Sequence, residues 1–239
     1  MHGSIGWKTG WTNGRYRRNM KVIELHRSVT ESNDRDAEEL RGILKKNKTF
    51  LINLMSSAGS GKTTFLSRTI SDMKDKYRIA VLEADIDASV DAERIAALGA
   101  RSIQVHTDGM CHMDAGMTRE GLEAMGMEEI DLVFLENIGN LICPAEYDTG
   151  AVKKVMILSI PEGDDKPLKY PLMFKESDVL IISKTDTLPW FNFDMEKCIE
   201  RVRFLNPDIQ IFPVSAKTGD GMAEWENWLT TETERWIGE

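Results

Sequence analysis

Cys111 and His112 place a thiol beside an imidazole in a chain that has only 3 cysteines and 4 histidines. Thiolates and imidazoles are ligands of Zn²⁺ and Ni²⁺. Neighbours on a regular strand point to opposite faces, so this pair can share a metal only on a turn or at a helix start. Gly109 before the pair and the helical pattern after it allow such a turn. Cys143, which precedes Pro144, is a third candidate ligand.

Two or three ligands are too few for a closed structural metal site, whereas two chains related by a two-fold axis offer four or more. The residues therefore favour a shared, releasable site for nickel or zinc. A local alternative stays open, because a Cys-His dipeptide can be incidental and Cys143 can be a small core residue. Cys198 lies in the helix-like segment 193–205 and is expected to pack there.

Residues 51–66 (LINLMSSAGSGKTTFL) give a strand, a glycine-rich turn and GKTT at a helix start, which is the context of a phosphate-binding loop. Glycines let backbone N–H groups turn toward phosphates, and the helix N-terminus adds free donors. Ser56 stands where the general pattern has glycine. The alternative is an ordinary turn between a strand and a helix. The expected nucleotide contacts are Gly59, Ser60, Gly61, Lys62, Thr63 and Thr64, with Lys62 on the β- and γ-phosphates and Thr63 on Mg²⁺.

Two further strand ends indicate guanine as the base. The Asp186 carboxylate can accept both N1–H and the 2-amino group of guanine, whereas adenine lacks this donor pair. Lys184 can lie along the base plane, and the Ala216 backbone can donate to the guanine oxygen. The usual GTPase motif is Asn-Lys-x-Asp, and Ser183 replaces the asparagine, which weakens the expected bracing between loops. The base-side residues are Lys184, Asp186, Ser215, Ala216 and Lys217.

Two carboxylates at strand ends are candidates for the magnesium site. Asp85 follows the strand at 79–84 and Glu136 ends the strand at 131–136, where ligands bind in open α/β sheets. Gly139 follows Glu136 in an E-x-x-G pattern and could sense the γ-phosphate. Either carboxylate could instead be a solvated strand-end residue. No glutamine or arginine finger is evident, so we expect slow hydrolysis by a catalytic set of Lys62, Thr63, Asp85 and Glu136.

The elements that must position these residues alternate between apolar strand patterns and helical ones. This order predicts an α/β fold of the P-loop NTPase kind, with a mainly parallel twisted sheet and helices on both faces. Residues 1–19 are expected to be a disordered extension, 20–48 an N-terminal helical segment with a helix at 33–47 that is capped by Asn33 or Asp34, and 49–237 the GTPase domain with inserted metal-binding segments. The expected strands are 50–55, 79–84, 102–106, 131–136, 154–160, 178–183 and 210–215, and a helix is expected at 221–236.

Composition narrows the class of partner. The net charge of −9 disfavours nucleic acid as the main partner. No apolar run approaches the roughly 20 residues of a membrane helix, so no membrane partner is expected. The sparse, odd number of cysteines is typical of a reducing compartment, and we expect the cytoplasm.

Several segments together resemble the hydrogenase nickel-incorporation GTPases: NLMSSAGSGKTT, VDAERI, GMCHMDA, FLENIGNLICPAEYDTG, PEGDDKPLKYP and NPDIQIFPVSAKTGDGM. The similarity runs from about Met20 to Trp228, and ENIGNLICPA beside a Cys-His pair is its specific part. It implies GTP/GDP and Mg²⁺ binding, a GTP-favoured homodimer, and nickel or zinc on Cys111, His112 and Cys143. It also implies nickel insertion during [NiFe]-hydrogenase maturation, with a maturation accessory protein and the hydrogenase large-subunit precursor as partners.

This chain departs from that family in several places. The first 50 residues hold no cysteine and only His2 and His26, whereas relatives often carry an N-terminal cysteine motif or a histidine-rich tract. Ala88 and Ser89 stand where threonines are common. Three rivals remain: a urease-accessory GTPase, which usually has Cys-Pro-His rather than Cys-Pro-Ala; a P-loop small-molecule kinase; and a nucleotide-dependent zinc sensor that delivers nothing.

Overall fold

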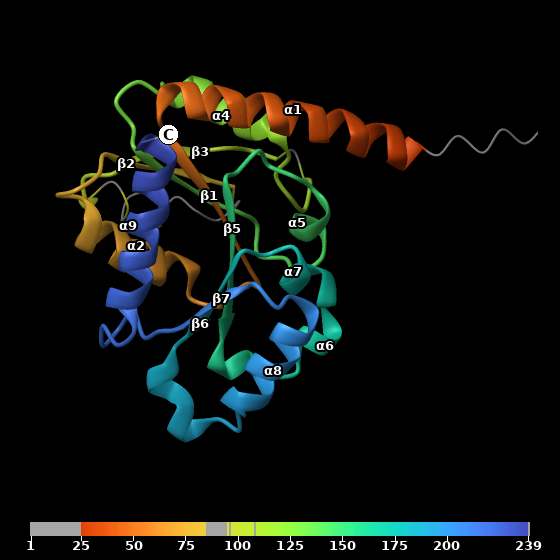
Figure 1. Ribbon diagram of the computed structural model, residues 1–239, viewed down its shortest axis with the longest axis vertical. Helices are drawn as coiled ribbons and strands as arrows, with labels where there is room; N and C mark the ends of the chain where they lie inside the picture. Colours follow the sequence, from red (N-terminus) through yellow and green to blue (C-terminus); the bar gives the residue numbers. More distant parts are fainter. Residues whose placement is uncertain (1–24, 85–94, 96, 108, 239) are drawn as a thin grey trace, which may run out of the picture.

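The computed structural model describes residues 25–84, 95, 97–107 and 109–238, and its centre is a parallel sheet (Figure 1). Its strand order is β3-β2-β4-β1-β5-β6-β7, and every pairing is parallel. This confirms the predicted fold class. The strands are β1 (Phe50–Ser56), β2 (Ile79–Glu83), β3 (Arg101–Gln104), β4 (Leu132–Glu136), β5 (Lys153–Ser159), β6 (Val179–Ser183) and β7 (Gln210–Pro213).

Helices cover both faces of the sheet, and the central strand β1 shows how. Phe50, Ile52 and Leu54 point into a core shared with α2 and α9, whereas Leu51 packs in the core below α1 and α4. Met55 enters a third core with α7 and α8. The helices are α1 (Leu25–Asn47), α2 (Lys62–Met73), α4 (Ala115–Met125), α5 (Cys143–Glu146), α6 (Lys166–Lys169), α7 (Pro171–Lys175), α8 (Met195–Leu205) and α9 (Met222–Gly238), with 3-10 turns η2 (Ile160–Glu162) and η3 (Thr185–Trp190).

Helix α1 begins at Leu25, whereas the sequence predicted a start near Asn33. Asn33 or Asp34 was expected to cap the helix, but both lie inside it, and the Asn33 side chain bonds to two distant segments. No glycine or proline interrupts residues 25–32, so the helix continues toward the N-terminus. Helix α1 lies beside α4 across one end of the molecule (Figure 1).

The predicted strands agree with the structure within about two residues at their ends. The chain leaves regular pairing early at β3 and β7, which end at Gln104 and Pro213 rather than at 106 and 215. The predicted extension 1–19 lies outside the described residues, as do Asp85, Ala88 and Ser89. None of the described helices is long and apolar enough to cross a membrane.

Candidate functional site

The phosphate loop joins β1 to α2 and its backbone turns where the sequence has glycine. Gly59 has φ +74° and Gly61, the N-cap of α2, has φ +95°. Side chains other than glycine rarely adopt such φ values, so these two positions need glycine for the turn. Ser56 is the last residue of β1 and is not among the described residues with positive φ, so it carries no strain of that kind.

Lys62 stands at the first turn of α2 with its side chain inside the loop. The residue is 7% exposed, and its Nζ donates to the Ser56 hydroxyl at 3.2 Å. The hydroxyl at position 56 thus holds the ammonium group within the loop that the sequence assigned to phosphates. A buried cation beside a glycine-rich turn at a helix start is suited to an anionic ligand.

Thr63 and Glu136 meet beneath the phosphate loop. The Thr63 hydroxyl donates to Glu136 Oε1 at 3.0 Å, and Glu136 is 6% exposed at the end of β4. A hydroxyl and a carboxylate oxygen are hard donors of the kind that Mg²⁺ takes, usually with water and phosphate oxygens completing the shell. The donor set therefore fits the magnesium ion expected here. Asp85, the third predicted magnesium residue, is outside the described residues.

The base-side loop is braced against the phosphate loop by two side chains. Lys184 Nζ donates to Gly59 O at 2.7 Å, and the Ser183 hydroxyl donates to Ser60 O at 2.8 Å. The serine that replaces the usual asparagine therefore still makes one direct bond between the loops. Because of these bonds, the base-side and phosphate-side residues share one rigid frame.

Asp186 is held in place by Ser215, whose hydroxyl donates to Asp186 Oδ1 at 2.8 Å. This bond comes from the loop after β7 and fixes the carboxylate expected to read guanine. A cavity of about 220 Å³ lies between the base-side and phosphate-side loops. Its lining consists of Ser60, Gly61, Thr64, Phe65, Ser183, Lys184, Asp186, Thr187, Ala216 and Lys217.

The turn after β4 connects the phosphate loop to the next segment of the chain. A Cβ at Gly139 would lie 3.0 Å from the Ala58 backbone nitrogen, so glycine permits this close approach. The buried Asn137 donates to Asn53 Oδ1 at 3.1 Å, and its own Oδ1 accepts from Met113 N at 3.3 Å. The residues just after Glu136 therefore contact both the phosphate loop and the segment that carries Cys111 and His112.

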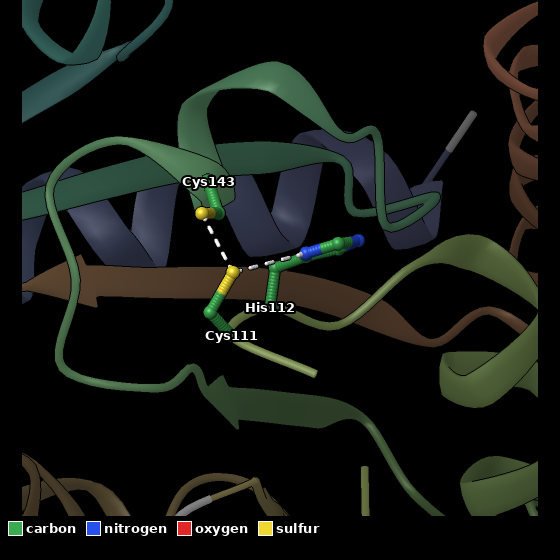
Figure 2. A group of neighbouring side chains, drawn as sticks. All are labelled: Cys111, His112 and Cys143. Carbon is green, nitrogen blue, oxygen red and sulfur yellow. Dashed lines mark hydrogen bonds between the residues drawn. The ribbon is translucent and has the colours of Figure 1, made fainter. Parts of the chain in front are cut away.

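Cys111, His112 and Cys143 form a compact cluster (Figure 2). Their ligand atoms all lie within 4.8 Å of one another. The Cys111 Sγ is 2.6 Å from the Cys143 Sγ and 3.8 Å from His112 Nδ1. Cys143 starts the short helix α5, and the Cys-His pair sits on the turn before α4, as the sequence required for the two side chains to cooperate.

The surroundings of the cluster influence its protonation. His112 is largely buried, and this burial lowers its pKa, although the nearby Asp114 and Glu146 carboxylates act in the opposite direction. The lowered pKa favours the neutral imidazole, which is the form that binds metals. The thiol hydrogen bond to Cys143 raises the pKa of Cys111. Metal binding therefore has to displace a thiol proton. Two thiols and one imidazole suit nickel or zinc, and Cys111 is exposed to an incoming ion or partner.

Cys198 lies apart from this cluster. It is fully buried in the core with α7 and α8, and burial raises the pKa of its thiol to about 12. A thiol in this environment does not ionise near neutral pH, so it does not act as a metal ligand. The expectation that Cys198 packs inside its helix is confirmed.

Three residues around the cluster were not anticipated from the sequence. Tyr147 stacks on His112 with ring centroids 3.7 Å apart and planes at 15°. Asn137 and Asn33 bind backbone groups close to the predicted ligands. In the sequence, an asparagine within a helical or strand pattern gives little indication that it supports a site, because its hydrogen-bond partners lie far away along the chain.

The fold, the phosphate loop and the base-side motif together define a P-loop GTPase. The family model described as CobW/HypB/UreG, nucleotide-binding domain, matches residues 50–213. This chain belongs to the CobW/HypB/UreG family.

Individual relatives extend this similarity beyond the nucleotide-binding domain. Hydrogenase maturation factor HypB of Escherichia coli (strain K12) is 44% identical over 212 residues, which cover 89% of this chain and 73% of that protein. The structure of HypB from Helicobacter pylori in complex with nickel matches with a TM-score of 0.80 at 37% identity, covering 85% of this chain and 96% of that one. The structure of hydrogenase maturation factor HypB from Archaeoglobus fulgidus matches with a TM-score of 0.80 at 33% identity, and the match covers 85% of this chain and 99% of that one.

Proposed function

We propose that this protein is a GTP-binding and GTP-hydrolysing metallochaperone that helps to insert nickel during [NiFe]-hydrogenase maturation. The observation that carries the proposal is the Cys111–His112–Cys143 cluster, placed at the end of a segment that leaves the nucleotide site. The similarity to HypB from Helicobacter pylori, whose structure holds nickel, supports nickel as the cargo. Zinc suits the same ligands and is the competing ion.

The proposed roles in the nucleotide site follow from the contacts described above. Lys62 binds the phosphates, and Thr63 and Glu136 would hold Mg²⁺, which would supply positive charge to the phosphates. Asp186 selects guanine, and Lys184 ties the base side to the phosphate loop. We expect slow hydrolysis suited to switching, because the sequence shows no evident glutamine or arginine finger.

The proposed coupling between nucleotide and metal runs through the turn after β4. Gly139 lies against the phosphate loop, and Asn137 holds the backbone beside His112. The same stretch continues to Cys143. A γ-phosphate that shifts this turn therefore changes the distance between the two thiols. The nucleotide must favour one arrangement by several kcal/mol to change metal binding strongly.

A GTP-favoured homodimer completes the proposal. Three ligands from one chain leave a tetrahedral ion short of one, and a second copy can supply more. Trp190 is 75% exposed and Phe191 45% exposed, next to the base-side residues, so apolar surface is available for a second copy near the nucleotide. Metal is then passed toward a maturation accessory protein and the hydrogenase large-subunit precursor.

Nickel titration of the wild type and of Cys111→Ala tests the proposal, with and without a non-hydrolysable GTP analogue. The wild type should bind nickel with a thiolate-to-nickel charge-transfer band, and the analogue should change its affinity. Cys111→Ala should lose at least tenfold in affinity, because one ligand is gone. Cys198→Ala is the matched control, since its thiol is buried in a separate core, and it should bind nickel as the wild type does. Equal nickel affinity in Cys111→Ala and the wild type would rule out the site.

A further inference from the structure

Helix α1 contacts both segments that carry the candidate metal ligands, and it does so through one buried side chain. Asn33 is 7% exposed, and its Nδ2 donates to Asp148 O at 2.8 Å. Its Oδ1 accepts from Ala115 N at 3.0 Å. Asp148 follows the Cys143 segment and Ala115 follows the Cys111–His112 segment, so one amide bridges the two halves of the cluster.

The neighbouring residues of α1 keep this bridge in position. Arg41 binds both carboxylate oxygens of Asp148, at 3.1 and 3.0 Å. A Cβ at Gly150, where φ is +75°, would come within 2.7 Å of Leu40 Cδ2, so the chain after Asp148 runs directly against α1. On the other side, Arg119 of α4 forms ion pairs with acidic residues of α1.

An asparagine suits this bridge because its side chain offers a donor and an acceptor at once. Aspartate would keep the acceptor for Ala115 N–H but would place a carboxylate against the Asp148 carbonyl oxygen. Alanine would leave the Ala115 N–H and the Asp148 C=O without this partner. Either change loosens the connection between two segments that also meet at the cysteines, at the stacked His112 and Tyr147 rings and at the Asn137–Met113 hydrogen bond.

We infer that Asn33 is a positioning residue of the metal site: it sets the separation of Cys143 from the Cys111–His112 pair without touching the ion. The inference rests on the proposed function, since it concerns the same metal cluster. Groups that orient metal ligands from outside the coordination shell typically change affinity by about 10- to 100-fold when removed. Because Asn33 acts through the backbone, we expect the lower end of that range.

The test measures nickel binding by Asn33→Ala and Asn33→Asp, with Asn47→Ala as the matched control. Asn47 lies on the same helix but is exposed, and its side chain donates to Ile43 O of its own helix. Each Asn33 variant should bind nickel about tenfold more weakly and show a shifted thiolate-to-nickel charge-transfer band. GTP affinity should stay unchanged in all three variants, since α1 does not line the nucleotide cavity.

The spectrum separates positioning from mere stability, because a purely structural role would lower the unfolding temperature without altering the band of the folded protein. If Asn33→Ala does not fold, nickel binding by Asn33→Asp and by Arg41→Met tests the inference instead. Arg41→Met removes the ion pair that holds Asp148 against α1. Wild-type affinity and spectrum in the folded variants overturn the inference. A wild type that binds no nickel, or a Cys111→Ala variant that binds it equally well, overturns the proposed function instead.

Discussion

At the scale of single residues, the nucleotide site is organised by hydroxyl groups that fix charged side chains. Ser56 accepts from Lys62, and Ser215 donates to Asp186. These serines hold a cation and an anion in one place before any ligand arrives. A preorganised site binds with a smaller entropy cost than one that must order its charged side chains on binding.

Asp186→Asn tests the base assignment. The amide removes one acceptor for the guanine N1–H and 2-amino groups and presents a donor instead, so GTP affinity should fall about 10- to 100-fold, or roughly 1–3 kcal/mol. Xanthosine triphosphate, which carries an oxygen where guanine has the amino group, should bind better to the variant than GTP does. Competition against a fluorescent nucleotide gives both affinities. A variant that still prefers GTP would place base recognition elsewhere.

At the scale of elements, the starts of β2 and β4 are joined by a charged pair. Asp131 accepts from Arg78 Nε at 3.0 Å, from its Nη2 at 2.7 Å and from its backbone N at 2.9 Å. These hydrogen bonds, led by the one from the Arg78 side chain, lower the pKa of Asp131 in the folded protein. Because the folded pKa lies below the unfolded value, the pair stabilises the fold above the unfolded pKa and loses that contribution as pH falls through the folded one.

Asp131→Asn should therefore lower the free energy of unfolding by about 1 kcal/mol at pH 7, a modest value because Arg78 is largely exposed. The difference from the wild type should shrink as pH falls below about 4, the ordinary aspartate pKa at which the unfolded chain begins to take up the proton, and it should vanish below the lowered folded pKa. Urea unfolding at several pH values measures it. Asp75→Asn, which removes an exposed carboxylate, is the control for net charge. A difference that does not depend on pH would mean that the ionised pair is not its source.

At the scale of the whole molecule, the candidate nucleotide residues and the candidate metal cluster lie at the carboxyl-terminal ends of the strands. The loops that carry the candidate nucleotide and metal residues follow β1, β3, β4, β6 and β7 at these ends. Ligands of open α/β sheets bind at this end of the strands. A larger groove of about 640 Å³ lies at the amino-terminal ends of β5, β6 and β7, and none of the candidate site residues lines it. The candidate nucleotide site and the candidate metal site therefore lie on the same side of the molecule, where a second copy could contact both.

The predicted dimer is checked by measuring molecular mass in solution. A non-hydrolysable GTP analogue with Mg²⁺ should shift the protein toward twice the monomer mass, because ligand that binds one assembly state preferentially stabilises it. GDP or removal of Mg²⁺ by chelation should reverse the shift. Asp186→Asn should need more of the analogue for the same effect. An unchanged mass under all these conditions would exclude nucleotide-driven dimerisation.

The sequence by itself determined the features that depend on short spacing. The strand–glycine–helix order of the phosphate loop, the alternation of strands and helices, and the placing of Cys111 beside His112 on a turn all follow from adjacent residues. The resemblance of several motifs to one GTPase family came from the same local patterns. Element ends were less well determined, and the start of α1 was placed too late, because Asn33 also looks like a helix cap.

Only the tertiary structure decided which distant residues meet. Cys111 follows β3 and Cys143 follows β4. These two strands lie on either side of β2 and run parallel, so the loops that follow them start at the same end of the sheet and bring the two thiols together. The Asn33 bridge and the Tyr147 stack depend on how α1 and α5 pack on that arrangement. Side-chain pairs far apart in sequence leave no fixed spacing to read, because their meeting is set by strand order and helix packing rather than by the periodicity of either segment.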